Sequence, residues 1–420
     1  MIGGVGMNLH SSFIEPRYNG QNFADLPATI RYWLTGKGEP AFERSLLGEY
    51  AKQYDIVFSF FIDSLGWELL QTYADENPFL RTLFQNGRVT KITSQFPSTT
   101  AAHVTCIHTG LPVGQSGVYE WQYYEPKLDA VIHPLLFSWA GTTERDQLLE
   151  AGVRPETVFP TKTLYTELKT DGVKSFVFGW RPFTPSTFSN VVMRGAEMRP
   201  FLPLPEGLID AVRHARAAYA PTYIFFYYGE IDTMCHLHGP DSMEVRAQIE
   251  TFAHAMEKWF LPFVQNLDKR ALLVMYADHG HMSVTPQNTR YLNTHRDLKK
   301  MVSMLRTNRR GDVLVPAGSP RDPFLYVRDE CLEEAQEFLA QRLDGYADVI
   351  PTRELVDAGY FGAKKISQEM QGRLGNLVVL PHPSNCVWWY EEDKFVQKYL
   401  GHHGGLTARE MEIPLALMEL

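Results

Sequence analysis

The chain has 420 residues, of which 44% are hydrophobic and 21% are charged, and its formal net charge is −9. The length suits one large α/β domain with an additional lobe, and the balanced composition excludes an intrinsically disordered protein. The negative charge and the lack of a long run of Lys or Arg argue against a long nucleic acid as partner. A small phosphorylated substrate is compatible with this charge, because bound cations can reverse the local field.

The first 20 residues contain no basic segment followed by an apolar run, so they do not resemble a secretory signal. The longest apolar runs, residues 56–62 and 223–228, are too short to cross a bilayer. The four cysteines are scattered and form no CxxC pair, which argues against a disulfide framework and against structural zinc. We therefore expect a cytoplasmic protein that does not associate with a membrane.

Three segments have the pattern of parallel strands covered on both faces, because each is a continuous apolar run rich in aromatic and β-branched residues. They are residues 55–62, 222–228 and 271–277. An acid follows each run closely: Asp63, Asp232 and Asp278. Any one of these acids alone would be read as a turn or helix-cap residue. Because ligands collect at the carboxyl ends of parallel strands, we expect the three to share one rim.

Helical patterns at residues 207–219 and 242–260 separate these runs. The alternation predicts an α/β fold with a mainly parallel central sheet and helices on both faces. Residues 281–400 contain further short strand-like and helix-like segments, and we interpret them as a smaller inserted lobe. The predicted catalytic core then consists of residues 1–280 and 401–420.

A candidate nucleophile lies in the segment FPSTT, which ends at Thr100. Ser98 and Thr99 are good cap residues, and a helix can continue to Gly110. Thr100 would then lie on the first turn, where free N–H groups and the helix dipole favour a phosphoryl group. Many helices begin this way, and Thr99 is the competing nucleophile. A threonine hydroxyl is a poor nucleophile unless a divalent cation helps to deprotonate it.

Candidate cation ligands occur in three further motifs. In DTMCHLHGP, Asp232 and His236 face the same way on a helical turn, with His238 as a rival ligand. In ADHGH, Asp278 and His279 are adjacent, and His281 is either a residue that supports the ligands or one without a role.

The third motif is HHGG, near the C-terminus, where either imidazole could complete a coordination shell. We prefer His403 to His402, because His403 directly precedes the two glycines. Taken singly, each of the three motifs could be an ordinary ion pair, turn or exposed loop.

Taken in order, FIDS, FPSTT, DTMCHLHGP, ADHGH and HHGG resemble the alkaline phosphatase superfamily, and within it the nucleotide pyrophosphatase/phosphodiesterase (type I phosphodiesterase) family. The resemblance spans about residues 55–405. It implies two divalent cations, preferably Zn²⁺ with Mn²⁺ as the alternative, and a phosphothreonine intermediate. One cation would be held by Asp232, His236 and His403, and the other by Asp63, Thr100, Asp278 and His279.

The resemblance also implies a substrate class, small molecules with phosphodiester or pyrophosphate bonds such as nucleotides. His103 stands where the family commonly has an Asn that contacts the phosphoryl oxygens, so a phosphomonoesterase or phosphonate hydrolase of the same superfamily is the alternative. Trp121 and Tyr124 could form an aromatic wall for a base, or pack in the core. A protein that binds metal or phosphate without turnover is a third hypothesis.

Overall fold

The computed structural model describes residues 9–362 and 365–420, and its central element is a seven-stranded sheet. The strand order is β2 (Arg88–Thr93), β17 (Glu412–Glu419), β9 (Ala271–Tyr276), β1 (Ile56–Ile62), β8 (Thr222–Tyr228), β6 (Lys174–Trp180) and β7 (Glu197–Phe201). β1 pairs in parallel with both β8 and β9, so the three predicted strands lie side by side. Only β17 runs antiparallel to its neighbours, which confirms the prediction of a mainly parallel sheet.

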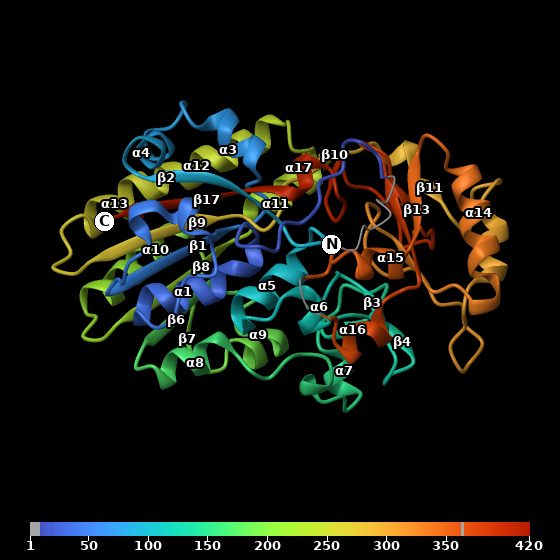
Figure 1. Ribbon diagram of the computed structural model, residues 1–420, viewed down its shortest axis with the longest axis horizontal. Coiled ribbons are helices and arrows are strands. Elements are labelled where there is room, and N and C mark those ends of the chain that lie inside the picture. Colours follow the sequence, from blue (N-terminus) through green and yellow to red (C-terminus); the bar gives the residue numbers. More distant parts are fainter. Residues whose placement is uncertain (1–8, 363–364) are drawn as a thin grey trace, which may run out of the picture.

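Helices cover both faces of this sheet (Figure 1). Successive side chains of β1 point to opposite faces: Phe60 packs on Phe260, directly after α12, whereas Phe61 packs on Phe23, just before α1. On one side α12 (Met243–Trp259) contacts both α4 (Pro78–Asn86) and α10 (Leu204–Arg216). On the other side α5 (Thr100–Thr109) contacts both α1 (Leu26–Thr35) and α8 (Leu164–Thr170).

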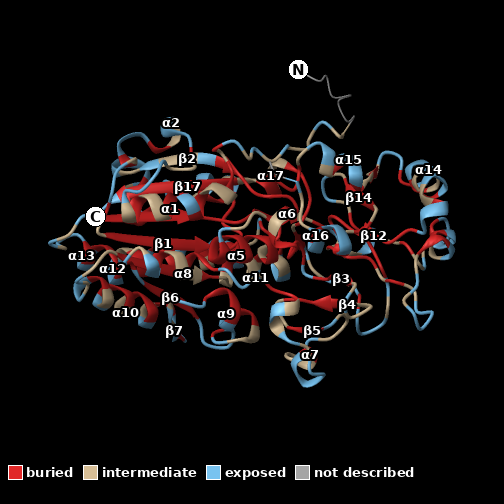
Figure 2. Cartoon of the chain, turned by 60° about the horizontal axis from the view of Figure 1, so that its bottom comes forward, coloured by how far each residue is buried: buried red, intermediate tan, exposed pale blue. Residues whose placement is uncertain are grey.

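Burial explains why the predicted strands are apolar throughout. Every residue of β1 and of β9 is buried, and Figure 2 shows the sheet buried along most of its length. A strand that is covered on both faces has no solvent side, so it needs no alternation of polar residues. Among the described residues, no helix is long and apolar enough to cross a membrane.

A smaller sheet lies beyond the carboxyl ends of the central strands. It contains β12 (Phe324–Leu325), β14 (Leu377–Pro381) and β13 (Ala347–Pro351), and it packs with α14 (Leu332–Arg342) around a second hydrophobic cluster. The residues of that cluster run from Leu292 to Phe395. This packing supports our proposal that residues 281–400 form an inserted lobe, although other residues of the same segment belong to the main core.

A further small sheet, β3 (Tyr123–Glu125), β4 (Ala130–His133) and β5 (Ser138–Trp139), adjoins this lobe. Gln122 Nε2 donates a hydrogen bond to Pro316 O at 2.7 Å, and the Tyr124 N–H donates to Tyr326 Oη at 2.8 Å. The segment that follows the predicted nucleophile helix is therefore tied to residues 316–326.

Candidate functional site

The three predicted acids lie at the carboxyl edge of the central sheet. Asp63 directly follows β1, and its N–H donates to Tyr228 O, at the end of β8, at 2.9 Å. Asp278 stands two residues after β9. Asp232 lies on α11 (Glu230–His238), which begins two residues after β8. Parallel strands thus bring together residues that are more than 200 positions apart in the chain.

Two histidines reach this edge by different routes. His236 is one helical turn after Asp232, and its Nε2 lies 3.6 Å from Asp232 Oδ1. His403 follows β16 (Gly401–His402), which pairs antiparallel with β10 (Met282–Ser283). In that register Met282 pairs with His402, so His281 stands opposite His403.

Asp232, His236, His281 and His403 form a group that we call the four-residue cluster, whose candidate ligand atoms all lie within 4.8 Å of one another. Two rival ligands point elsewhere. His238 Nδ1 lies 3.8 Å from Glu244, and His402 Nε2 is hydrogen-bonded with Gln397 Oε1 at 3.1 Å.

A second group, the three-residue cluster, consists of Asp63, Asp278 and His279. His279 Nε2 lies 3.6 Å from Asp63 Oδ1 and 3.1 Å from Asp278 Oδ2. Thr100 is the first residue of α5, and its Oγ1 lies 3.2 Å from His279 Nε2 and 3.5 Å from Asp63 Oδ2. The candidate nucleophile therefore faces this cluster.

The two clusters are adjacent. The rings of His279 and His403 stack with centroids 3.7 Å apart. Ser64 lies between the clusters, because its Oγ donates to Asp232 Oδ1 at 2.8 Å while its N–H donates to Asp278 Oδ1 at 3.1 Å. Ser64 has a φ of 64°, a left-handed conformation that is uncommon for serine.

Backbone carbonyls orient three of the histidines. Nδ1 lies within hydrogen-bond distance of Gly401 O for His236 (2.9 Å), of Ser98 O for His403 (2.9 Å) and of Gly280 O for His279 (3.1 Å). A carbonyl can only accept, so each Nδ1 carries the proton. Each Nε2 lone pair is then directed at the carboxylates, as in histidines that bind metals.

Described side chains balance the charges at this site only in part. Burial opposes ionisation of Asp278, but the neighbouring His279 outweighs it and holds the pKa of Asp278 below its usual range. Among the described residues, Asp63 Oδ1 and Asp278 Oδ2 are buried without a hydrogen-bond partner. Burial, with the nearby Asp278 and Asp232, raises the pKa of Asp63 well above its usual range. Burial and neighbouring histidines lower the pKa of His403 well below its usual range. Buried acceptors without donors fit cations, which would supply the missing positive charge.

Tyr227 supports the site and was not predicted from the sequence. Tyr227, in β8, donates its hydroxyl hydrogen bond to Asp63 Oδ2, which leaves Asp63 Oδ1 facing His279. Nothing in the run TYIFFYY distinguishes this tyrosine from its neighbours, because all of them fit a buried strand.

The predicted substrate contacts are placed differently. His103 is fully buried: its Nδ1 bonds Thr99 O at 2.7 Å, and its Nε2 accepts from the Gln95 N–H at 3.0 Å, so neither ring nitrogen faces a substrate. Trp121 is 44% exposed, with its ring beside His133. Tyr124 donates its hydroxyl hydrogen bond to Asp129 at 2.7 Å. Roles for Trp121 and Tyr124 in binding remain predictions.

The family assignment comes from the sequence as a whole. The profile of the type I phosphodiesterase / nucleotide pyrophosphatase family matches residues 57–406. The chain belongs to this family. It is accordingly an enzyme, a hydrolase of the phosphodiesterase/pyrophosphatase type. A search of curated proteins found no match.

Solved structures share the fold of this family member. Murine ectonucleotide pyrophosphatase/phosphodiesterase 5, in an inactive form with a threonine replaced by alanine and in complex with AMP, has a TM-score of 0.63 at 17% identity, covering 86% of this chain and 87% of its own. The human protein of the same name has a TM-score of 0.62 at 14% identity with the same coverage. Phosphonoacetate hydrolase from Sinorhizobium meliloti, in complex with phosphonoformate, has a TM-score of 0.61 at 17% identity. The match covers 86% of this chain and 89% of the hydrolase chain.

Proposed function

We propose that this family member hydrolyses phosphodiester or pyrophosphate bonds in small, nucleotide-like substrates by a two-cation mechanism with Thr100 as the nucleophile. The observation that carries the proposal is the position of Thr100 Oγ1, 3.2 Å from His279 Nε2 and beside two buried groups of candidate ligands. A hydroxyl needs such a neighbourhood to react near neutral pH.

The residues divide into two sets. Asp232, His236 and His403 would hold the first cation. Asp63, Asp278 and His279, with Thr100 Oγ1, would hold the second. Oxygen and nitrogen donors of this kind suit Zn²⁺, with Mn²⁺ as the alternative. When bound, such ions lower the pKa of a coordinated hydroxyl and offset the negative charge that develops on a phosphoryl group.

Thr100 is also placed to bind the substrate. It begins α5, whose first-turn N–H groups have no partner within the helix and can donate to phosphoryl oxygens. In the first step a bond forms from Thr100 Oγ1 to phosphorus and the bond to the leaving oxygen breaks. Water then cleaves the phosphoryl–threonine bond and restores the hydroxyl. The murine relative, inactive with alanine in place of a threonine, supports this role.

The substrate class rests on the family and on AMP in the murine structure. A phosphonate hydrolase is the second candidate, because the phosphonoacetate hydrolase shares the fold with similar coverage and His103 has no free ring nitrogen for a phosphoryl oxygen. Rates on bis-p-nitrophenyl phosphate, p-nitrophenyl phosphate, a nucleotide p-nitrophenyl ester and phosphonoacetate separate the candidates. A preference for the nucleotide ester supports the first candidate, and a preference for phosphonoacetate supports the second.

Replacing Thr100 by Ala tests the nucleophile. We expect kcat to fall by about 10⁴-fold or more, with two cations per chain retained and no phosphoryl group trapped on the protein by acid quenching. Thr99→Ala is the matched control, because Thr99 is the adjacent hydroxyl and its side chain makes no cap hydrogen bond with α5. Near-normal activity of Thr100→Ala, or loss of activity only in Thr99→Ala, would refute the assignment.

A further inference from the structure

We propose that His281 is a fourth protein ligand of the first cation, bound through Nε2. The inference rests on the proposed function and extends it, since the set given above contains only Asp232, His236 and His403. His281 is 1% exposed. Its Nε2 lies 3.8 Å from Asp232 Oδ1 and is, within residues 9–362 and 365–420, a buried nitrogen with no hydrogen-bond partner.

Hydrogen bonding determines which His281 nitrogen carries the proton. Ser64 Oγ has one proton and donates it to Asp232 Oδ1 at 2.8 Å. Towards His281 Nδ1, at 2.9 Å, the same oxygen must therefore accept. The proton of neutral His281 is thus on Nδ1, and the lone pair is on Nε2, the atom directed at Asp232. His236, His279 and His403 likewise carry the proton on Nδ1 and the lone pair on Nε2. In those three residues Nδ1 donates to a backbone carbonyl instead of a serine oxygen.

The spacing suits a four-coordinate ion. Bonds of about 2.0–2.1 Å to nitrogen and oxygen place the ligand atoms of a tetrahedral ion about 3.4 Å apart. From Asp232 Oδ1, the Nε2 atoms of His236, His281 and His403 lie at 3.6, 3.8 and 3.9 Å. All three imidazoles are therefore at similar distances from the carboxylate, and small shifts would close them around one cation.

The competing interpretation is that His281 is an ordinary buried histidine with no ligand. His103 is an example of such a histidine in this chain. Both ring nitrogens of His103 are bonded to protein atoms, Nδ1 to Thr99 O and Nε2 to the Gln95 N–H. His281 has only one such bond, although it is equally enclosed. Leaving a buried polar atom without a partner is unfavourable, so the unpartnered Nε2 indicates a ligand.

The local fold places His281 beside His403. Met282 and Ser283 pair with His402 and Gly401, and this two-stranded ribbon holds His281 opposite His403. Gly401 is required for the close approach, because a Cβ atom there would lie 2.3 Å from Cys235 O and 3.0 Å from the His281 ring. The first cation would then have four protein ligands, the number that a tetrahedral zinc site takes.

The test compares His281→Gln with two matched variants, His402→Gln and His403→Gln, by equilibrium dialysis against a graded zinc chelator with elemental analysis. We expect His281→Gln to bind the first Zn²⁺ at least about 100-fold more weakly than wild type, because the loss of a residue that only supports a ligand already costs about 10–100-fold. His402→Gln should bind both ions normally. In the Co²⁺-loaded protein, the intense absorption of a four-coordinate site should weaken in His281→Gln.

The outcomes separate this inference from the proposed function. If His281→Gln keeps the zinc affinity and the cobalt spectrum of the wild type while His403→Gln loses zinc, the role of His281 is overturned and the proposed function stands. Wild-type affinity for both ions in both variants would refute the ligand set proposed for the first cation in the proposed function. Should His281→Gln fail to fold, Ser64→Ala serves instead, since it removes the Oγ that accepts from His281 Nδ1 and donates to Asp232 Oδ1. Ser64→Ala should lower the affinity for the first Zn²⁺ by about 10-fold or more, and an unchanged affinity would overturn the inference.

Discussion

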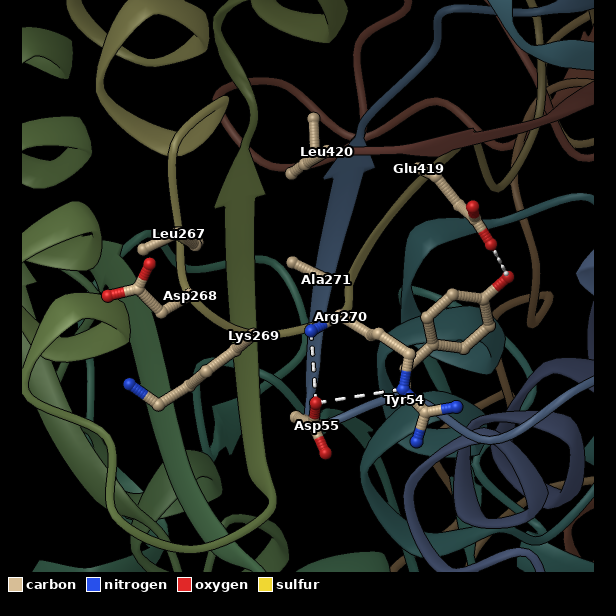
Figure 3. Close-up of a pocket in the computed structure, with 9 residues that line it drawn as sticks. All are labelled: Tyr54, Asp55, Leu267, Asp268, Lys269, Arg270, Ala271, Glu419 and Leu420. Carbon is tan, nitrogen blue, oxygen red and sulfur yellow. Dashed lines mark hydrogen bonds and ion pairs between the residues drawn. The ribbon is translucent and has the colours of Figure 1, made fainter.

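The two ends of the seven-stranded sheet both carry acidic side chains, but these differ in burial and in pairing. At the amino end lies an open pocket of about 380 Å³ (Figure 3). There Asp55 accepts from the Arg270 N–H at 2.9 Å and lies 3.8 Å from the Arg270 guanidinium, and Glu419 pairs with Lys52 and with the Tyr54 hydroxyl. At the carboxyl end, Asp63 and Asp278 are buried with unpartnered oxygens among the described residues.

The two ends differ in how their charges are compensated. The open pocket at the amino end contains paired, partly exposed charges such as Asp55 and Glu419, which interact weakly because water screens them. At the carboxyl end, Asp63 and Asp278 each have a buried oxygen to which no described side chain donates a hydrogen bond. Such an imbalance costs free energy unless a ligand supplies the opposite charge. Unpaired buried charge therefore locates the candidate site, whereas the described lining of the open pocket at the amino end lacks this feature.

The sharpest contrast between the ends comes from Asp278→Asn. We expect a loss of about 10⁴-fold in kcat/KM together with loss of the second cation, because the variant removes a charged ligand beside Thr100. Activity assays paired with elemental analysis measure both quantities. Asp55→Asn, at the amino end, should leave both unchanged. Equal effects of the two substitutions would remove the distinction between the ends.

Stability should differ between the ends as well. Arg321 and Glu410, both fully buried, form a two-pronged ion pair at 3.0 and 2.9 Å, and Glu410 also accepts from the Gly405 N–H in the loop after His403. Glu410→Gln should lower the free energy of unfolding by about 3–5 kcal/mol, since Arg321 loses its buried counter-charge. Urea denaturation measures this, and a change below about 1 kcal/mol would contradict the account.

Removal of the cations from the carboxyl end should destabilise the fold. With free Zn²⁺ at about 100 times its dissociation constant, each bound ion stabilises the fold by about 2.7 kcal/mol. Chelation should therefore lower the melting temperature, and added Zn²⁺ should restore it. A thermal melt with EDTA, then with excess Zn²⁺, checks this. A melting temperature insensitive to EDTA would indicate that the fold holds no ion there.

Tyr227→Phe tests the support of the three-residue cluster. The variant removes the hydroxyl that donates to Asp63 Oδ2, and we expect the second cation to bind about 10–100-fold more weakly. Tyr228→Phe is the control, because the hydroxyl of that neighbouring residue bonds Gln248 on another element. Chelator competition measures the affinities. Identical values for the two variants would exclude a positioning role for Tyr227.

The smallest effect is expected at the amino end. Asp55 and Arg270 are about half exposed, with 47% and 63% of their side-chain areas accessible. Asp55→Ala should change the free energy of unfolding by about 0–1 kcal/mol, and less at high salt. Urea denaturation at two salt concentrations tests this. A loss as large as that of Glu410→Gln would show that exposure does not separate the two ends.

Much of the fold followed from periodicity and local signals. The apolar runs at residues 55–62, 222–228 and 271–277 correspond to β1, β8 and β9, and the helical pattern at 242–260 corresponds to α12, with Ser242 as its cap. The antiparallel β17 was not predicted, because its place between β2 and β9 is set by pairing with strands far away in the chain.

The site was predictable only in part, for the same reason. Motifs identified the acids and histidines that the structure brings together at one edge, including Thr100 beside His279. The position of His281 depends on the register between β10 and β16, more than 100 residues apart, and no local pattern encodes that register. Ser64 and Tyr227 act through hydrogen bonds to Asp232 and Asp63, which depend on three-dimensional proximity alone.

The most direct test of the central claim is a crystal structure of the zinc-loaded protein with anomalous diffraction data collected at the zinc absorption edge. We expect two anomalous peaks, one enclosed by Asp232, His236 and His403 and the other by Asp63, Asp278 and His279 next to Thr100. A single peak, peaks elsewhere, or none at the carboxyl edge of the sheet would contradict it.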